Sequence, residues 1–534
     1  MIESGKYEGT TRRPANRLDR LGQVLSGASL GWRVRRILAI ALTVVLAALI
    51  AVACGPAGGK QAVKSTGITL ALQGEPTTLD PQYADDGNMQ MVADNIFQTL
   101  LELNGKTLTL QPCLATSYKR MDDNTWRFTL RQGVTFHNGE PLTADDVVFS
   151  VHRIIDPEYK SQVVGNVATI VKAVKVDSQT VDIVTSGPDP LLPMRTTLLP
   201  IMNRKAVEAA GDKVVTTPVG TGPYKLKEWN RGVSLTLEAY PGYWGPKPAV
   251  TSDTYRFIQE GATRLAAVKA GEVDLSVNML PEYAKELPQV KSSEGLEFYF
   301  VRLCQFRGIT KDPRIRLAAC LAIDRDSLVK DLFQGYATVA QGQLLKPGYV
   351  GFNPELKPYP YDPERAKALL KEAGYNGEKV QLVSERGRWL KDTEVSEAVA
   401  DMLRAVGFNV QLTFLSFQEW LATLFDQSRA PDMQFSSHSN PMFDADRIFT
   451  ACLASTGTQS AYKNPDLDAL IVKARTELDP AVRQALYEKI GKAAYEDPAW
   501  VTLVNVKDIY GLSSRIAWEP RQDGRILLSE ITLK

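Results

Sequence analysis

Side chains that could do catalytic chemistry are sparse in this chain of 534 residues. The three histidines, His137, His152 and His438, do not occur in an HExxH arrangement, so a zinc hydrolase of that type has no ligands. Adjacent carboxylates such as Asp145 and Asp146 occur where helix caps are expected. A secreted hydrolase with two carboxylates converging in one cleft stays open as an alternative. The residue types favour binding over catalysis.

Cysteine spacing gives no metal site either. Cys113, Cys304, Cys320 and Cys452 form no CxxC or zinc-type spacing, so we predict no metal and no cofactor. In an oxidising compartment two of them could pair, but the sequence does not choose among the three pairings. Four buried thiols are the other interpretation, and both stay open.

Charge excludes one class of partner and marks one segment. Lys and Arg total 62 and Asp and Glu total 61, so no strong field would attract nucleic acid. Residues 1–53 are an exception, because they hold eight basic side chains and three acidic ones.

The N-terminal segment has the pattern of a bacterial lipoprotein signal. Arg33, Arg35 and Arg36 precede seventeen uncharged residues, 37–53, which end in small side chains directly before Cys54. We therefore predict a signal peptide over 1–53, lipidation of Cys54 and a flexible tether over 54–65. A plain membrane anchor or ordinary secretion is the alternative, since seventeen residues is the lower limit for a span. In each case the globular body lies outside the cytoplasmic membrane.

Beyond the tether, helical and strand patterns alternate, as in an α/β protein. Residues 68–72 and 125–130 alternate with period two and predict strands. Residues 363–373 predict a helix capped by Asp362 and ended by Gly374. A second helix over 395–406 precedes a strand over 409–414. A short strand is also expected at 134–136.

Five blocks of sequence resemble the family 5 extracellular solute-binding proteins, the large binding proteins of ABC importers for dipeptides, oligopeptides, nickel and related solutes. The first block contains WRFTLRQGVTFHNGEPLTADDVVFS, at 126–150. The others, in the family's order, are 220–226 with 243–244, 270–274, 312–316 leading to 323–325, and 361–363 leading to 373–375. The resemblance extends over nearly all of 66–534.

The resemblance implies a type II periplasmic-binding-protein fold, with two α/β lobes joined by a hinge and an extra subdomain inserted in the first lobe. It implies that lobe one comprises residues 66–110, 196–298 and 503–534. The inserted subdomain would be 111–195 and lobe two 299–502. A ligand would then bind between the lobes and shift a hinged molecule toward its closed state.

The same resemblance suggests which residues face the ligand. The expected ligand-binding residues are Tyr83, Asn88 and Gln90 in lobe one and Arg386, Arg388, Trp389, His438, Asn440 and Asp444 in lobe two. The Arg386 to Trp389 turn is the strongest candidate, because a rigid aromatic ring beside two fixed cations suits an anionic or polar ligand.

The nature of the solute stays open between two classes. Peptide-binding members of the resembled family pair the peptide ammonium with an Asp in a lobe-two loop, but here Asn440 or Pro441 occupies that position. Asp444 or Asp446 could replace it if the loop were shifted by one turn. The solute is therefore a peptide, or a different polar solute such as an opine, a glycoside or a metal chelate.

The expected partners are the solute, the transmembrane subunits of an ABC permease and the membrane, the last through the lipid. We expect a monomer at the periplasmic or cell-surface face of the cytoplasmic membrane. A receptor-coupled sensor with the same fold is an alternative that the sequence does not separate from an importer.

Overall fold

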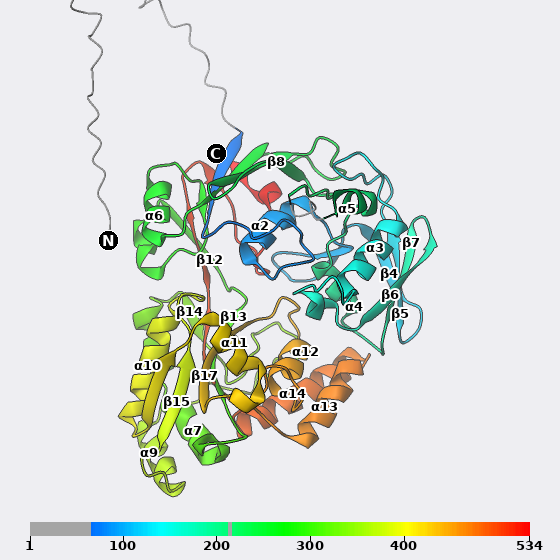
Figure 1. Ribbon diagram of the computed structural model, residues 1–534. Helices are drawn as coiled ribbons and strands as arrows, with labels where there is room; N and C mark the ends of the chain where they lie inside the picture. Colours follow the sequence, from blue (N-terminus) through cyan, green and yellow to red (C-terminus); the bar gives the residue numbers. More distant parts are fainter. Residues whose placement is uncertain (1–65, 212–215) are drawn as a thin grey trace, which may run out of the picture. The chain divides into compact units, whose positions relative to one another are not determined.

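The computed structural model describes residues 66–211 and 216–534 (Figure 1). The predicted signal peptide, the tether and Cys54 lie outside the described residues. In the part of the chain that the structure describes, no helix is both long and apolar enough to cross a bilayer.

The fold is α/β, with three main sheets. The largest has the strand order β12-β19-β11-β1-β10-β9-β8. Its strands are β1 (Gly67–Leu72), β8 (Tyr224–Asn230), β9 (Ser234–Ala239), β10 (Ser252–Phe257), β11 (Leu275–Ser276), β12 (Gln289–Ser293) and β19 (Asp508–Leu512). The helices connected to this sheet are α2 (Gly87–Ile96), α5 (Arg204–Ala210) and α6 (Gly261–Lys269). Strand β1 pairs in parallel with β10 and β11, and its side chains Ile68, Leu70 and Leu72 are buried in one core.

The second sheet has six strands in the order β14-β18-β13-β17-β15-β16. They are β13 (Glu297–Leu303), β14 (Ala337–Val339), β15 (Lys379–Ser384), β16 (Asn409–Phe414), β17 (Met433–Ser439) and β18 (Trp500–Val506). The helices between and after them are α7 (Pro313–Leu321), α8 (Arg325–Ser327), α9 (Pro363–Glu372), α10 (Asp392–Ala405), α11 (Phe417–Phe425), α12 (Ala445–Ile448), α13 (Pro465–Thr476) and α14 (Pro480–Glu496). Figure 1 shows this second lobe in yellow and orange, below the first.

A third, four-stranded sheet of order β4-β5-β7-β6 forms the inserted subdomain. Its elements are β4 (Ala115–Arg120), β5 (Thr125–Leu130), α3 (Ala144–Ile155), β6 (Ile170–Asp177), β7 (Thr180–Thr185) and α4 (Leu192–Arg195). Two small ribbons complete the described strands: β2 (Leu101–Leu103) with β3 (Leu110–Pro112), and β20 (Ile516–Ala517) with β21 (Thr532–Leu533).

The chain passes between the two large sheets at two adjacent crossings. One joins β12 to β13 and the other joins β18 to β19. The crossings touch, because a Cβ atom on Gly295 would lie 2.6 Å from the carbonyl oxygen of Val506. Lys346 Nζ donates to the carbonyl oxygens of Glu294 and Gly295 at 2.7 and 2.6 Å and holds the first crossing in place. Two short crossings side by side are the geometry of a two-strand hinge.

Local signals account for several elements. Helix α9 begins where Asp362 accepts a hydrogen bond from the Arg365 backbone at 2.9 Å, and Gly374 follows it with a φ of +76°. Helix α10 begins at Asp392, three residues earlier than predicted, because Lys391 adopts a left-handed φ of +57° directly before it. The strand expected at 134–136 is wrong. Only an isolated bridge between Thr135 and Pro141 forms there, since β5 pairs with β4 and β7 instead.

Two of the predicted lobe boundaries fall within strands of the second sheet. Strand β18 extends through the boundary predicted after residue 502, and β13 begins just before the one predicted after residue 298. The lobe boundaries are therefore kept as a proposal. The assignment of each strand to its sheet comes from the structure.

Candidate functional site

A cavity of about 1000 Å³, with both charged and apolar side chains in its lining, opens where both lobes and the inserted subdomain meet. That volume is at the upper end of the range for small-molecule sites in proteins. It is lined by residues from α2 and the segment after it, from 162–168 and 195–200 in and beside the inserted subdomain, from 438–459 in lobe two, and from 508–530 near the C-terminus. Residues more than 400 positions apart in the sequence therefore face one space.

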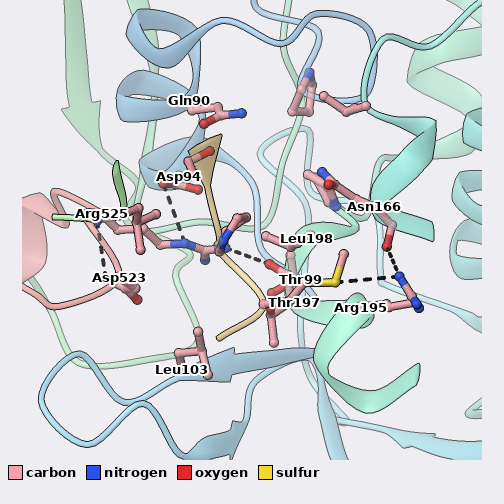
Figure 2. A pocket seen from close by; sticks show the side chains of 18 of the residues that line it. Gln90, Asp94, Thr99, Leu103, Asn166, Arg195, Thr197, Leu198, Asp523 and Arg525 are labelled. Carbon is pink, nitrogen blue, oxygen red and sulfur yellow. Dashed lines mark hydrogen bonds and ion pairs between the residues drawn. The ribbon is translucent and has the colours of Figure 1, made fainter. Parts of the chain in front are cut away.

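Helix α2 forms part of the lobe-one wall. Asp86 starts this helix by accepting hydrogen bonds from the backbone of Asn88 and Met89. Gln90 and Asp94, four residues apart, then lie on one face of the helix and line the cavity, as Figure 2 shows. Burial raises the pKa of the Asp94 carboxyl, and Arg525, 3.8 Å away, opposes that rise. Arg525 also donates to the carbonyl oxygen of Thr197 at 2.6 Å, which ties the C-terminal segment to this wall.

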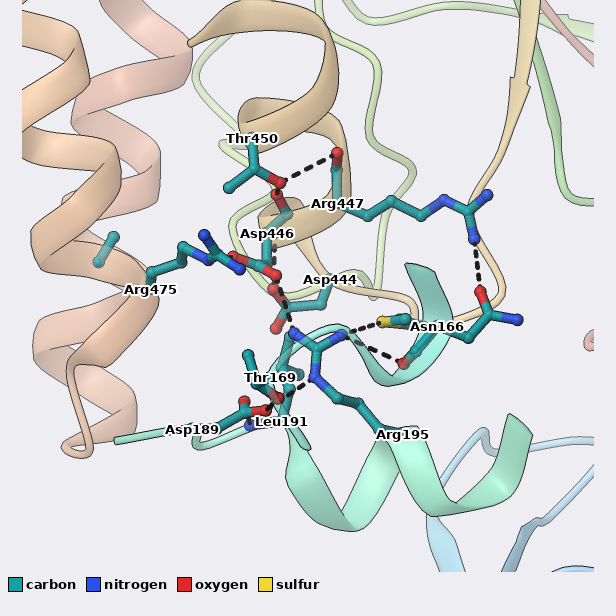
Figure 3. Close-up of polar contacts among 12 residues, drawn as sticks. Asn166, Thr169, Asp189, Leu191, Arg195, Asp444, Asp446, Arg447, Thr450 and Arg475 are labelled. Atoms are coloured by element: carbon teal, nitrogen blue, oxygen red, sulfur yellow. Dashed lines mark hydrogen bonds and ion pairs between the residues drawn. The ribbon is translucent and has the colours of Figure 1, made fainter. Parts of the chain in front are cut away.

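Charged side chains from α12 and α4 cross-link lobe two to the inserted subdomain (Figure 3). Arg195 donates to Asp189 at 2.7 Å within its own segment and to Asp446 of α12 at 3.1 Å. Asp446 also lies 3.1 Å from Arg475 of α13. Arg447 donates to the side-chain oxygen of Asn166 at 3.1 Å. These contacts join parts of the chain on either side of the cavity.

Two of the nine predicted site residues, Gln90 and His438, line this cavity. His438 on β17 is buried, and its Nδ1 lies 2.8 Å from the carbonyl oxygen of Ser439. A carbonyl only accepts, so Nδ1 carries the proton and Nε2 is an acceptor. Burial, reinforced by the Arg447 charge, lowers the pKa of His438 to about 3, so the ring is neutral at physiological pH.

Asn440 and Asp444 are turned inward, although they lie in the loop expected to bind the ligand. Asn440 donates to the backbone carbonyl of Asp444 at 2.9 Å. Asp444 caps α12 and forms a two-pronged ion pair with Arg483, at 2.5 and 2.7 Å. The Asp444 carboxylate is 1% exposed and is not among the cavity-lining residues, so it holds the loop to α14.

The Arg386 to Trp389 turn lies outside the lining of the cavity as well. The guanidinium carbon of Arg386 lies 4.0 Å from the centre of the Phe414 ring, and that of Arg388 lies 4.6 Å from the Phe417 ring. The Trp389 ring packs edge-on against Trp420. These three side chains are held by aromatic neighbours within lobe two.

The remaining two predicted residues, Tyr83 before α2 and Asn88 in its first turn, do not line the cavity. Tyr83 is 41% exposed, and its ring packs edge-on against the Tyr159 ring, with the two ring centres 5.8 Å apart. The side chain of Asn88 lies close to Gly74, where an added Cβ atom would be 3.2 Å from it.

Several charged residues of the cavity were absent from the predicted set. They are Asp94, Arg195, Glu297, Arg447 and Arg525. Asp446 was considered as a free carboxylate, but in the structure it is paired with Arg195 and Arg475. Most have no local signal, because partners such as Arg195 and Asp446 are 251 residues apart. Glu297 did have one: it is the acidic first residue of the otherwise mostly apolar strand β13.

The described residues contain neither a disulfide nor a cluster of side chains that could hold a metal ion. Cys113, Cys304, Cys320 and Cys452 are buried free thiols, which selects one of the two interpretations left open by the sequence. Burial raises the pKa of Cys320 and of Cys452 to about 12. Within 66–211 and 216–534 no group of three His, Cys, Asp or Glu side chains is arranged to hold a metal ion.

Comparison with known proteins agrees with this architecture. The chain is 29% identical over 458 residues to the glutathione-binding protein GsiB of Shigella dysenteriae, an alignment that covers 82% of this chain and 88% of GsiB. The periplasmic binding protein DppA of Helicobacter pylori, solved with the peptide STSA, is 25% identical with a TM-score of 0.73 over 88% of this chain and 98% of DppA. NikA of Brucella suis, solved with Fe(III)-EDTA, is also 25% identical, with a TM-score of 0.79 over 88% of this chain and all of NikA.

These relatives are binding proteins and not enzymes, and their fold is the type II periplasmic-binding-protein fold. The family model for bacterial extracellular solute-binding proteins, family 5, matches residues 109–460, which is well over half of the chain. The chain belongs to the family 5 bacterial extracellular solute-binding proteins.

Proposed function

We propose that this protein captures a small polar solute, with peptides as the first class to test, in the cavity between its lobes and delivers it to an ABC permease. The observation that carries the proposal is the cavity of about 1000 Å³ with its wall shared among three parts of the chain. A site divided in this way forms only when the lobes approach, so ligand binding and closure are coupled.

The names of the relatives support the peptide class. GsiB is named for glutathione, a small peptide, and DppA was solved with a tetrapeptide. NikA was solved with a metal chelate, which keeps a different polar solute as the second class.

Solution scattering with a mixed library of di- to pentapeptides tests this mechanism. Binding should reduce the radius of gyration, and the bound peptide should be recovered intact after prolonged incubation. Consumption of the peptide by the purified protein would refute the transport function and favour an enzyme. Ligand binding with no change in dimensions would refute the hinged closure.

We also propose that Cys54 is lipidated and anchors the protein to the outer face of the cytoplasmic membrane. The support is the apolar segment 37–53, which ends in small residues directly before Cys54. Cys54→Ala should release the protein or leave it uncleaved. An unmodified N-terminus upstream of residue 53 in the intact mass of the membrane form would contradict the anchor.

A further inference from the structure

Five arginines line the cavity, and four of them have carboxylate partners. These are Arg195 with Asp189 and Asp446, Arg475 with Asp446, Arg521 with Asp523 and Glu530, and Arg525 with Asp94. Arg447 differs. Among residues 66–211 and 216–534, no carboxylate oxygen lies within 4.0 Å of its guanidinium nitrogens.

The surroundings of Arg447 make an anionic partner favourable. Its hydrogen bond within the described chain is the one to the neutral side chain of Asn166. Figure 3 shows its side chain extending away from the Asp446 ion pairs toward Asn166. The residue is half-buried, and burial lowers its pKa, although Asp85 and Glu297 oppose that effect. A partly desolvated guanidinium without a carboxylate in direct contact is costly, and a ligand carboxylate would reduce that cost.

Glu297 presents the opposite charge to the same cavity. It is the first residue of β13, directly after the hinge crossing, and its carboxylate accepts a hydrogen bond from Ser437 Oγ. Within the described ranges no Lys, Arg or His nitrogen lies within 4.0 Å of that carboxylate. Burial raises its pKa, while the Lys346, Arg388 and Arg447 charges oppose the rise. Glu297 is therefore a second charged side chain at the cavity that has no oppositely charged side chain within ion-pair distance in the described chain.

Strand register places the Glu297 and His438 side chains on opposite faces of the second sheet. Glu297 pairs with Ser439 across the β13–β17 ladder, and Phe298 pairs with His438. Nε2 of His438 is left as an acceptor because Nδ1 donates to the Ser439 carbonyl. Glu297 and its hydrogen-bond partner Ser437 therefore share one face of the β13–β17 ladder, and Arg447 follows β17 on α12.

We propose, on the basis of the solute-binding function above, that Arg447 and Glu297 form a subsite for a zwitterionic ligand. Arg447 binds the ligand carboxylate, and Glu297 binds its ammonium group. The ligand class is a short peptide with both termini free. The cavity has room for such a molecule.

Calorimetric titration of the purified full-length protein in detergent tests the two halves separately. A mixed library of di- to pentapeptides identifies the tightest peptide, which is then compared with its C-terminal amide and its N-acetyl form. Each cap should weaken binding about 10- to 100-fold, the usual effect of losing a hydrogen bond to a charged group. This arm needs no variant, so it does not depend on a mutant folding.

Two variants then test which residue recognises each peptide terminus. Arg447→Gln should bind the free acid and the amide equally, and Glu297→Gln should bind the free amine and the acetylated form equally. Arg365→Gln and Glu372→Gln are matched controls, because this pair lies on α9, about half exposed and outside the cavity lining. Both controls should keep the full preference for the uncapped peptide.

Three results would overturn the subsite. Binding that is indifferent to both caps would overturn it and leave solute capture standing. An acetyl effect abolished by Asp85→Asn but kept in Glu297→Gln would move the ammonium away from Glu297. Failure of every peptide to bind would reject the zwitterionic class, whereas turnover of a bound peptide would count against the transport function itself.

Discussion

Two acidic residues on the lobe-two side of the cavity, Asp446 and Glu297, have opposite electrostatic surroundings. Asp446 lies 3.1 Å from both Arg195 and Arg475. Glu297 has Ser437 as its hydrogen-bond partner and no cation within ion-pair distance in the described chain. The comparison separates charges that the protein satisfies by itself, which fix its conformation, from charges that it leaves for a ligand.

The largest effect is expected at Asp444, the most completely paired acid of this region. Asp444→Ala would leave the buried Arg483 guanidinium without its counter-charge, which should lower the free energy of unfolding by about 3–5 kcal/mol. Chemical denaturation of the variant measures the change. A loss below 1 kcal/mol would show that solvent reaches Arg483 and that Asp444 is not needed to fix the conformation of this region.

A smaller loss, with a change of conformation, is expected at Asp446. Asp446→Asn weakens the link from α12 to Arg195 and should cost about 2–3 kcal/mol, the range for a hydrogen bond between charged groups plus residual desolvation. Because that link joins lobe two to the inserted subdomain, the ligand-free variant should also have a larger radius of gyration in scattering. Unchanged dimensions would mean that the link does not hold the lobes together.

The pH dependence of stability tests the electrostatic surroundings of His438, which lines the same cavity as Glu297. The pKa of His438 is about 3 in the folded protein and about 6.5 when unfolded, so only the unfolded state takes up a proton between these values. Stability is therefore lost as the pH falls below 6.5, by about 2 kcal/mol between pH 6.5 and pH 5.

His438→Gln has no such titration, so the wild-type protein should lose that much more stability than the variant over this pH range. Denaturation curves of both proteins at pH 6.5 and pH 5 give the difference. Parallel curves would show that the ring gains a proton in the folded state and is not a neutral acceptor.

The smallest effect is expected at Arg386, which lies outside the cavity lining. Arg386→Ala removes the stacking on Phe414 and should cost about 0.5–1 kcal/mol of stability, with peptide affinity unchanged within twofold. Calorimetry decides the point. A loss of affinity of tenfold or more would support the ligand-binding role expected from the sequence and would extend the site beyond the cavity.

The fold was predictable where local signals agree with tertiary packing. Residues 125–130 and 409–414 alternate in polarity and form β5 and β16 with those bounds, and Asp362 and Gly374 lie at the two ends of α9 as expected. Asp324 likewise caps α8, and the neighbouring Arg325 guanidinium donates to the backbone carbonyls of Thr502 and Tyr359.

The site was predictable only in part, and the reason is topological. Gln90 and His438 follow from their place in the chain relative to family blocks. Arg195 and Asp446 form their ion pair although they are 251 residues apart in the sequence. Whether the Asp444 carboxylate is available to a ligand depends on Arg483, which lies on the later helix α14. Residue types near a loop indicate that charge is present. Which charges remain unpaired is decided by packing between distant segments.

The four buried thiols make unfolding visible to chemical labelling. A thiol-reactive reagent attacks the thiolate, and with pKa values near 12 at Cys320 and Cys452 almost none exists in the folded state at pH 8. Cys320 lies in the core of lobe two and Cys113 in that of the inserted subdomain. Alkylation followed by peptide mass mapping would therefore report separately when each part of the molecule opens.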